Sequence, residues 1–160
     1  MPEIQSFGGI LALLGGIAAV VRRKHAIGGW LLYFFFQVLL GLALVAASTH
    51  WTLYASREWS DPVRYFLFTV SNLSRVAVLA AIAVMCVSLA DTRDYQWVCG
   101  LQWALAMYGF LTIVKLPVDM YCFPSAVNRD SLSMAFPVVW MGYFTVSVRV
   151  RKVFLEKRWS

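Results

Sequence analysis

The stretch Val21–Leu40, VRRKHAIGGWLLYFFFQVLL, decides the fold class of this chain. Three cations near its start are followed by a nearly unbroken apolar run that continues to Ala47. A helix needs about 20 mostly apolar residues to cross a hydrocarbon layer about 30 Å thick. The run Ile27–Ala47 meets this requirement, so we expect it to be a transmembrane helix with its basic end at the cytoplasmic surface.

Three further runs have the length and composition of spans: Tyr65–Leu89, Trp97–Met120 and Leu132–Val148. Ser60-Asp61-Pro62 predicts a capped helix start with proline in the first turn, and we expect Asp94 and Asp130 to cap the third and fourth spans. The sequence thus predicts an all-α integral membrane protein, a bundle of four long transmembrane helices plus a short N-terminal hydrophobic helix. The segment Ser48–Arg64 is expected to be a loop that lies along the membrane surface on its aromatic residues.

The composition supports a membrane protein with one compact domain. Of 160 residues, 61% are hydrophobic and 14% charged, whereas a soluble domain carries about a quarter charged residues. We expect residues 1–24 to form a short hydrophobic helix and a basic turn, and residues 25–160 to form the four-span domain. The net charge of +6 comes mostly from cations at the ends of apolar runs, which argues against nucleic-acid binding.

The run Phe7–Val21 is shorter than the others. Gly8, Ala12 and Gly16 recur every four residues, a spacing that lets helix backbones approach closely. We favour a short extra span over a re-entrant or interfacial helix, because its polar face is too weak for an interfacial one.

Basic residues predict the orientation. In an up-and-down threading, nine cations fall on one side and three on the other, so the rule that cytoplasmic loops are richer in Lys and Arg places the C-terminus in the cytoplasm. The nine include Arg149, Arg151 and Lys152 near the C-terminus, which suit anionic lipid headgroups at about 1 kcal/mol per charge. The three are Arg57, Arg64 and Arg129.

Two end motifs carry a family resemblance. Ile27-Gly28-Gly29-Trp30-Leu31 opens the first long span, and Trp140, Tyr143-Phe144 and Ser147–Phe154 close the last one. Together they resemble the YdgK-like family of small four-span bacterial inner-membrane proteins, a domain family of unknown function, over about residues 25–156. The family pattern often has proline before the last-motif tyrosine, where this chain has Gly142. The resemblance implies the bacterial inner membrane and no particular activity; both motifs also suit plain anchoring and packing of the bundle.

Arg75 is the most informative single residue. It lies about ten residues into its span, and a charged side chain at that depth costs at least about 2.5–3.5 kcal/mol unless it is solvated or paired. Asn72 lies one turn away, and Gln37 is expected at similar depth in the first long span. Lys115 and Asp119 form an i,i+4 pair around Pro117.

One acid among these residues faces two cations, so we expect one positive charge to lack a protein partner. Water, a lipid phosphate or an anionic ligand would then meet it. The structural alternatives are that Lys115 snorkels outward and that Arg75 pairs with Asp119.

The sequence contains no recognisable catalytic set. We see no Ser-His-Asp arrangement, phosphate-binding glycine loop or zinc spacing among Cys86, Cys99 and Cys122. His25 and His50 lie at opposite ends of one span and cannot hold one metal ion or haem iron together. We therefore expect a non-enzyme without cofactor or metal.

The leading hypothesis is an accessory or modulatory subunit that binds a larger inner-membrane protein. The alternative is a small transporter or lipid-binding protein in which Arg75 and Lys115 receive an anionic group. Membrane lipids are expected partners in both cases.

Overall fold

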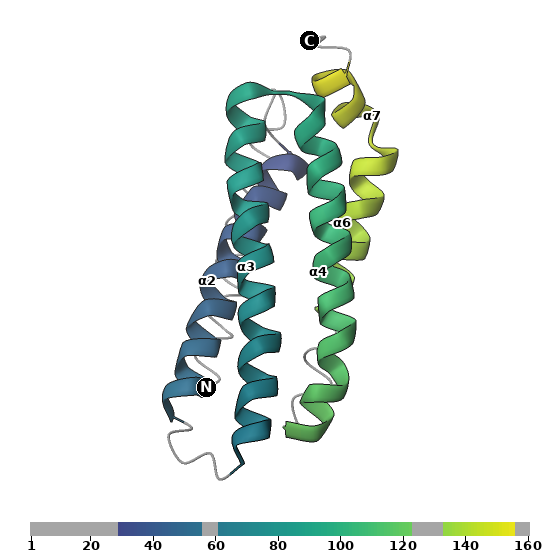
Figure 1. Ribbon diagram of the computed structural model, residues 1–160. Coiled ribbons are helices and arrows are strands. Elements are labelled where there is room, and N and C mark those ends of the chain that lie inside the picture. Colours follow the sequence, from purple (N-terminus) through teal and green to yellow (C-terminus); the bar gives the residue numbers. More distant parts are fainter. Residues whose placement is uncertain (1–28, 56–60, 123–132, 156–160) are drawn as a thin grey trace.

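The computed structural model describes residues 29–55, 61–122 and 133–155, and these residues form helices and turns without a strand. The helices are α2 (Trp30–Ala55), α3 (Pro62–Thr92), α4 (Tyr95–Cys122), α6 (Ala135–Val146), a single turn α7 (Val148–Val150) and a π-helical turn η2 (Arg151–Leu155). In Figure 1, α3 packs against both α2 and α4, and α6 lies alongside α4. Helix α2 crosses behind α3, so that its first turns lie between α3 and α4 in this view.

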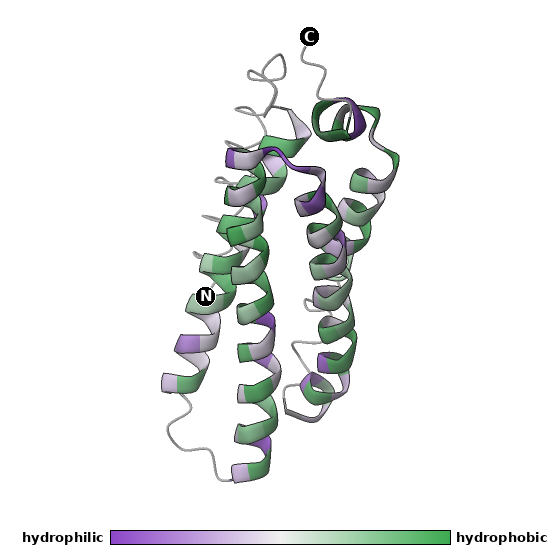
Figure 2. Ribbon diagram, turned by 45° about the horizontal axis from the view of Figure 1, so that its top comes forward, coloured by the Kyte–Doolittle hydropathy of each residue, from purple (hydrophilic) through white to green (hydrophobic). Residues whose placement is uncertain are grey.

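Three helices are long and apolar enough to cross a membrane. They are α2, α3 and α4, with 26, 31 and 28 residues, which exceeds the roughly 20 residues a span requires. Figure 2 shows apolar residues along all three and hydrophilic ones concentrated in the turn between α3 and α4. The chain thus has the fold of a multi-pass, all-α membrane protein.

The expectation of a fourth long helix is not confirmed. In place of Leu132–Val148, the structure has α6 with 12 residues, about 18 Å at 1.5 Å per residue. The helix stops because Ser147 has extended backbone angles, φ −67° and ψ 113°, and its hydroxyl accepts a hydrogen bond from the Val150 amide at 3.4 Å to begin α7. The expected start at Leu132, the Asp130 cap and the segment Phe7–Val21 lie outside the described residues.

The predicted surface loop Ser48–Arg64 is wrong in its first half, because α2 continues to Ala55. The hydroxyl groups of this segment bond to the helix itself: Ser48 donates to the Val45 carbonyl at 3.0 Å, and Thr52 donates to the Ser48 carbonyl at 2.8 Å. Ser and Thr hydroxyl groups that bond to a carbonyl three or four residues earlier are compatible with a helix interior, although they do not favour it.

The predicted caps of α3 and α4 are present. The Asp61 carboxylate accepts from the Val63 amide at 2.9 Å, and the Asp94 carboxylate accepts from the Gln96 amide at 3.2 Å. Arg93, with φ 56°, ends α3 in the left-handed conformation.

The bundle has two ends, which are named by α3. The Pro62 end is where α3 begins, and the Arg93 end is where α3 turns into α4.

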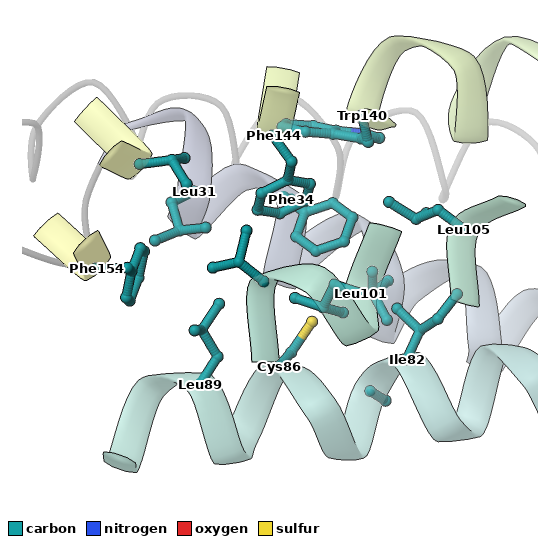
Figure 3. Packing of buried hydrophobic residues seen from close by; sticks show 14 of the residues in the cluster. Leu31, Phe34, Ile82, Cys86, Leu89, Leu101, Leu105, Trp140, Phe144 and Phe154 are labelled. Atoms are coloured by element: carbon teal, nitrogen blue, oxygen red, sulfur yellow. The ribbon is translucent and has the colours of Figure 1, made fainter. Parts of the chain in front are cut away.

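The apolar core occupies the half of the bundle nearer the Arg93 end. Phe34 of α2 is fully buried and meets the rings of Trp140 and Phe144 at centroid distances of 4.9 and 5.0 Å. Figure 3 shows these rings above aliphatic residues of α3 and α4, among them Leu89 and Leu101. The last helical turns close this end, because Val153 and Phe154 are buried in the same cluster.

Candidate functional site

Arg75 joins three parts of the bundle. It is buried on α3, and its Nη2 donates to the Tyr108 hydroxyl of α4 at 3.1 Å and to the Ser133 hydroxyl, in the turn before α6, at 3.3 Å. The guanidinium also lies over the Tyr108 ring, 5.3 Å from its centroid. This contact is a cation–π interaction, which gains strength when it is shielded from water.

The charge of Arg75 is not neutralised by an acid of the described residues. Its hydrogen-bond partners are hydroxyl groups, and its Nε is buried without a hydrogen-bond partner. A buried donor left in this state costs about 1–3 kcal/mol, and more when the group is charged. Arg75 is therefore the part of the described structure most in need of a partner.

Asp119 does not pair with Arg75. Both of its carboxylate oxygens lie 2.6 Å from Lys115 Nζ, one turn away on α4, and both side chains are buried. Lys115 thus stays inside the bundle, where its Nζ is 6.0 Å from the centroid of the Phe68 ring. The snorkelling alternative for Lys115 does not describe this arrangement.

The other two predicted site residues have local partners. Asn72, one turn from Arg75, is buried and donates to the Phe68 carbonyl at 2.9 Å. Gln37 accepts from Trp140 Nε1 at 2.8 Å. Because Gly41 lies against Leu79 in an antiparallel helix pair, Gln37 is nearer the Arg93 end than Arg75 is. The structure therefore groups Asn72 with Arg75 but separates Gln37 from both.

The buried polar side chains lie in one half of the bundle. Those described lie at the level of Arg75 or closer to the Pro62 end, whereas the buried residues of α3 and α4 toward the Arg93 end are apolar. The polar set consists of Thr49, Asn72, Arg75, Thr112, Lys115 and Asp119. Among the described residues, the buried polar side chains thus extend from Arg75 toward the Pro62 end, beside the buried Phe68, and apolar packing closes the bundle toward the Arg93 end.

Tyr108 and Ser133 were not selected from the sequence. Tyr108 lies within an apolar run, and Ser133 lies just before α6. The one available signal is that a tyrosine hydroxyl in a span needs a hydrogen-bond partner, but which partner it meets depends on how α3 and α4 are aligned.

The motif that opens the first long span and the motif that closes the last one meet in the half of the bundle near the Arg93 end. Gly29 has φ 61°, a conformation that glycine adopts without steric cost, and its carbonyl accepts the first bond of α2 from Tyr33 at 3.1 Å. Trp140 of the second motif bonds to Gln37 and packs on Phe34. The motifs therefore pack the bundle together.

Aromatic residues of α2 and α6 line a groove of about 500 Å³ at this end. Of the predicted headgroup contacts, Arg151 and Lys152 are exposed beside the buried Val153 and Phe154. The side chain of Arg149 is outside the described set.

The fold and this site define a class, a small helical membrane protein with a buried cation. No family model, curated protein or solved structure matches the chain. The resemblance to the YdgK-like family accordingly stays a prediction.

Proposed function

We propose that this protein is a non-enzymatic membrane protein that binds an anionic group at Arg75. The observation that carries the proposal is the buried Arg75 Nε without a hydrogen-bond partner, on a guanidinium whose described partners are hydroxyl groups. Charged side chains inside a membrane are rarely left in this state, and they commonly mark ion or substrate pathways.

The charge count supports an anion as the ligand. Arg75 and Lys115 contribute two positive charges to the described interior and Asp119 one negative charge, and Lys115 holds Asp119 at 2.6 Å. The remaining positive charge is on Arg75, so an anion is the ligand that would lower the free energy of the bundle.

The position of the buried polar side chains in one half of the bundle favours binding of an anion over its passage through the bundle. Buried polar residues lead from the Pro62 end to Arg75, and the apolar cluster closes the way beyond it. Because the basic residues of the sequence favour a cytoplasmic Arg93 end, we propose that the anion enters from the non-cytoplasmic side. The same bias and the family resemblance lead us to propose the bacterial inner membrane as the location.

Thermal unfolding of the purified protein in a nonionic detergent, with and without small anions, tests this function. Chloride, acetate, sulfate and phosphate are added to the detergent sample, and reconstitution into nanodiscs that contain phosphatidylglycerol tests a lipid phosphate separately. At least one of these anionic groups should raise the melting temperature of the wild type and not that of Arg75→Gln. Arg64→Gln, an exposed arginine of the same helix that pairs with Asp61, is the matched control and should keep the response. Equal responses of all three proteins would contradict the proposal.

The second candidate is an accessory subunit that docks a larger membrane protein. The groove between α2 and α6 supports it, because five of its lining residues are aromatic: Trp30, Tyr33, Phe136, Trp140 and Tyr143. Val139→Trp, which fills this groove, should release a partner from gently solubilised native membranes. Val138→Trp, an exposed neighbour outside the groove lining, should not. Migration of the wild type as a free monomer would exclude this candidate.

Arg151 and Lys152 add a proposed contact with lipids. They are exposed on a turn whose Val153 and Phe154 are anchored in the core, so both cations are held at the Arg93 end. We propose that they contact anionic headgroups of the cytoplasmic leaflet.

A further inference from the structure

We infer that the anion at Arg75 is a compact, singly charged carboxylate that reaches the site from the Pro62 end, and not the phosphate of a bilayer phospholipid. This inference rests on the proposed anion-binding function and specifies its ligand. Four observations carry it: the depth of Arg75, the net charge of the interior, the free donors and the packing around them.

Depth argues against a phospholipid headgroup. Arg75 lies 13 residues after Pro62 and 17 residues before Thr92, the two ends of α3, or about 20 and 26 Å at 1.5 Å per residue. It is thus near the middle of a helix that is longer than the membrane is thick. Lipid phosphates lie outside a hydrocarbon core about 30 Å thick, so a phospholipid in its leaflet keeps its phosphate roughly 15 Å away from this level.

Net charge argues for a monoanion. The described interior carries Arg75, Lys115 and Asp119, which sum to one positive charge. A singly charged ligand brings this sum to zero. A doubly charged one, such as sulfate, would leave a negative charge in an apolar environment, which is again unfavourable.

Two donors next to each other suit a carboxylate. The Nε–H of Arg75 has no acceptor. The Tyr108 hydroxyl accepts from Arg75 Nη2, and a hydroxyl that accepts a bond still has its own hydrogen to donate. The two oxygens of one carboxylate can accept from both donors, and a hydrogen bond in which the donor or the acceptor is ionised is about twice as strong as a neutral one.

The packing requires a small ligand. Arg75 and Tyr108 are each about 96% buried, at 4% exposure. The ring of Phe136 lies 6.1 Å from that of Tyr108, and Leu79, one turn from Arg75, begins the apolar cluster. Asn72 and Thr112 are the buried polar neighbours toward the Pro62 end, so entry from that end keeps the carboxylate near polar groups.

The experiment titrates the full chain in phosphatidylcholine nanodiscs with acetate and butyrate, and follows unfolding by tryptophan fluorescence. Both probes should raise the melting temperature in a saturable way. Tyr108→Phe, which keeps the charge and the ring, should weaken the apparent affinity at least about tenfold through loss of one charge-assisted bond. Tyr33→Phe, a tyrosine of the groove at the other end, should leave the affinity unchanged. Arg75→Gln should abolish the shift.

Sulfate and phosphatidylglycerol distinguish the sources of an anionic group. If either stabilises the wild type more than butyrate does, and Arg75→Gln removes this effect, the carboxylate inference is overturned while anion binding at Arg75 stands. If no probe stabilises the protein in a way that depends on Arg75, both the carboxylate inference and the proposed anion-binding function fail. An unchanged butyrate affinity in Tyr108→Phe also overturns the carboxylate inference. This result can be obtained even if Arg75→Gln does not fold.

Discussion

The Arg75 guanidinium of α3 donates to the Tyr108 hydroxyl of α4 at 3.1 Å and lies over the ring of the same residue. One side chain therefore gives Arg75 both a hydrogen-bond acceptor and a face of negative potential, while no acid of the described residues pairs with it. Tyr108 thus stabilises the positive charge of Arg75 inside the bundle but does not neutralise it. The proposed function depends on this remaining charge.

The Lys115–Asp119 pair gives a prediction about charge balance. Asp119→Asn removes the carboxylate that lies 2.6 Å from Lys115 Nζ, and removal of one partner of a buried ion pair costs about 3–5 kcal/mol. Unfolding in detergent should show a large loss of stability for Asp119→Asn, and Lys115→Gln added to it should restore part of that loss. Rescue by Arg75→Gln in place of Lys115→Gln would show that Asp119 compensates Arg75 instead.

Phe34 tests the location of the core. It is fully buried between Trp140 and Phe144, and removal of such a side chain to alanine costs about 3–5 kcal/mol. Thermal unfolding of Phe34→Ala should therefore show a melting temperature well below that of the wild type. Phe66→Ala, at a position 64% exposed on α3, is the control and should change it little. Similar effects of both variants would mean that the core is elsewhere.

Two glycines should respond to alanine in opposite directions. Gly29 has φ 61°, which costs an alanine about 1–2 kcal/mol, so Gly29→Ala should lower stability at the start of α2. Gly142 is inside α6, and a Cβ there would meet no atom within 4 Å. Gly142→Ala should raise stability by about 0.5–1 kcal/mol through helix propensity. Equilibrium unfolding of both variants checks the pair, and a stabilising Gly29→Ala would contradict the described start of the helix.

Orientation can be measured by cysteine labelling in intact cells, on a background without the native cysteines. Val63→Cys, at an exposed position in the first turn of α3, should react with an impermeant maleimide from outside. Asp91→Cys, in the last turn of the same helix, should react only after lysis. The reverse pattern would place the Arg93 end outside and overturn the proposed direction of entry.

Hydropathy and cap residues were sufficient to predict three helices of the bundle. The starts of α3 and α4 follow from Asp61 and Asp94, whose carboxylates accept from amides of the first turn. The end of α2 could not be predicted, because Ser48 and Thr52 look like loop residues until their hydroxyl groups are seen to bond within the helix. The break at Ser147 was missed because the apolar run continues past it and hydropathy does not report backbone angles.

The candidate site was predictable in part. The cost of a charge in a membrane selects Arg75, Lys115 and Asp119 from the sequence, and the one-turn spacing of Lys115 and Asp119 gives their pairing. The partners of Arg75 depend on the alignment of α3 with α4 and on the path of the chain into α6, which hydropathy does not determine. Gln37 was expected near Arg75 from its depth in a run, but it bonds to Trp140.

The proposed function requires that a bound anion meets the charge of Arg75, which no acid of the described residues neutralises. Crystals of the full chain grown with sodium bromide provide the measurement, because bromide is an unreactive, compact monoanion that gives an anomalous signal. We expect an anomalous peak beside Arg75, in contact with Arg75 Nε and the Tyr108 hydroxyl. An aspartate or glutamate of the chain at that position, with no peak beside it, would show that the protein itself neutralises Arg75 and that no anion binds there.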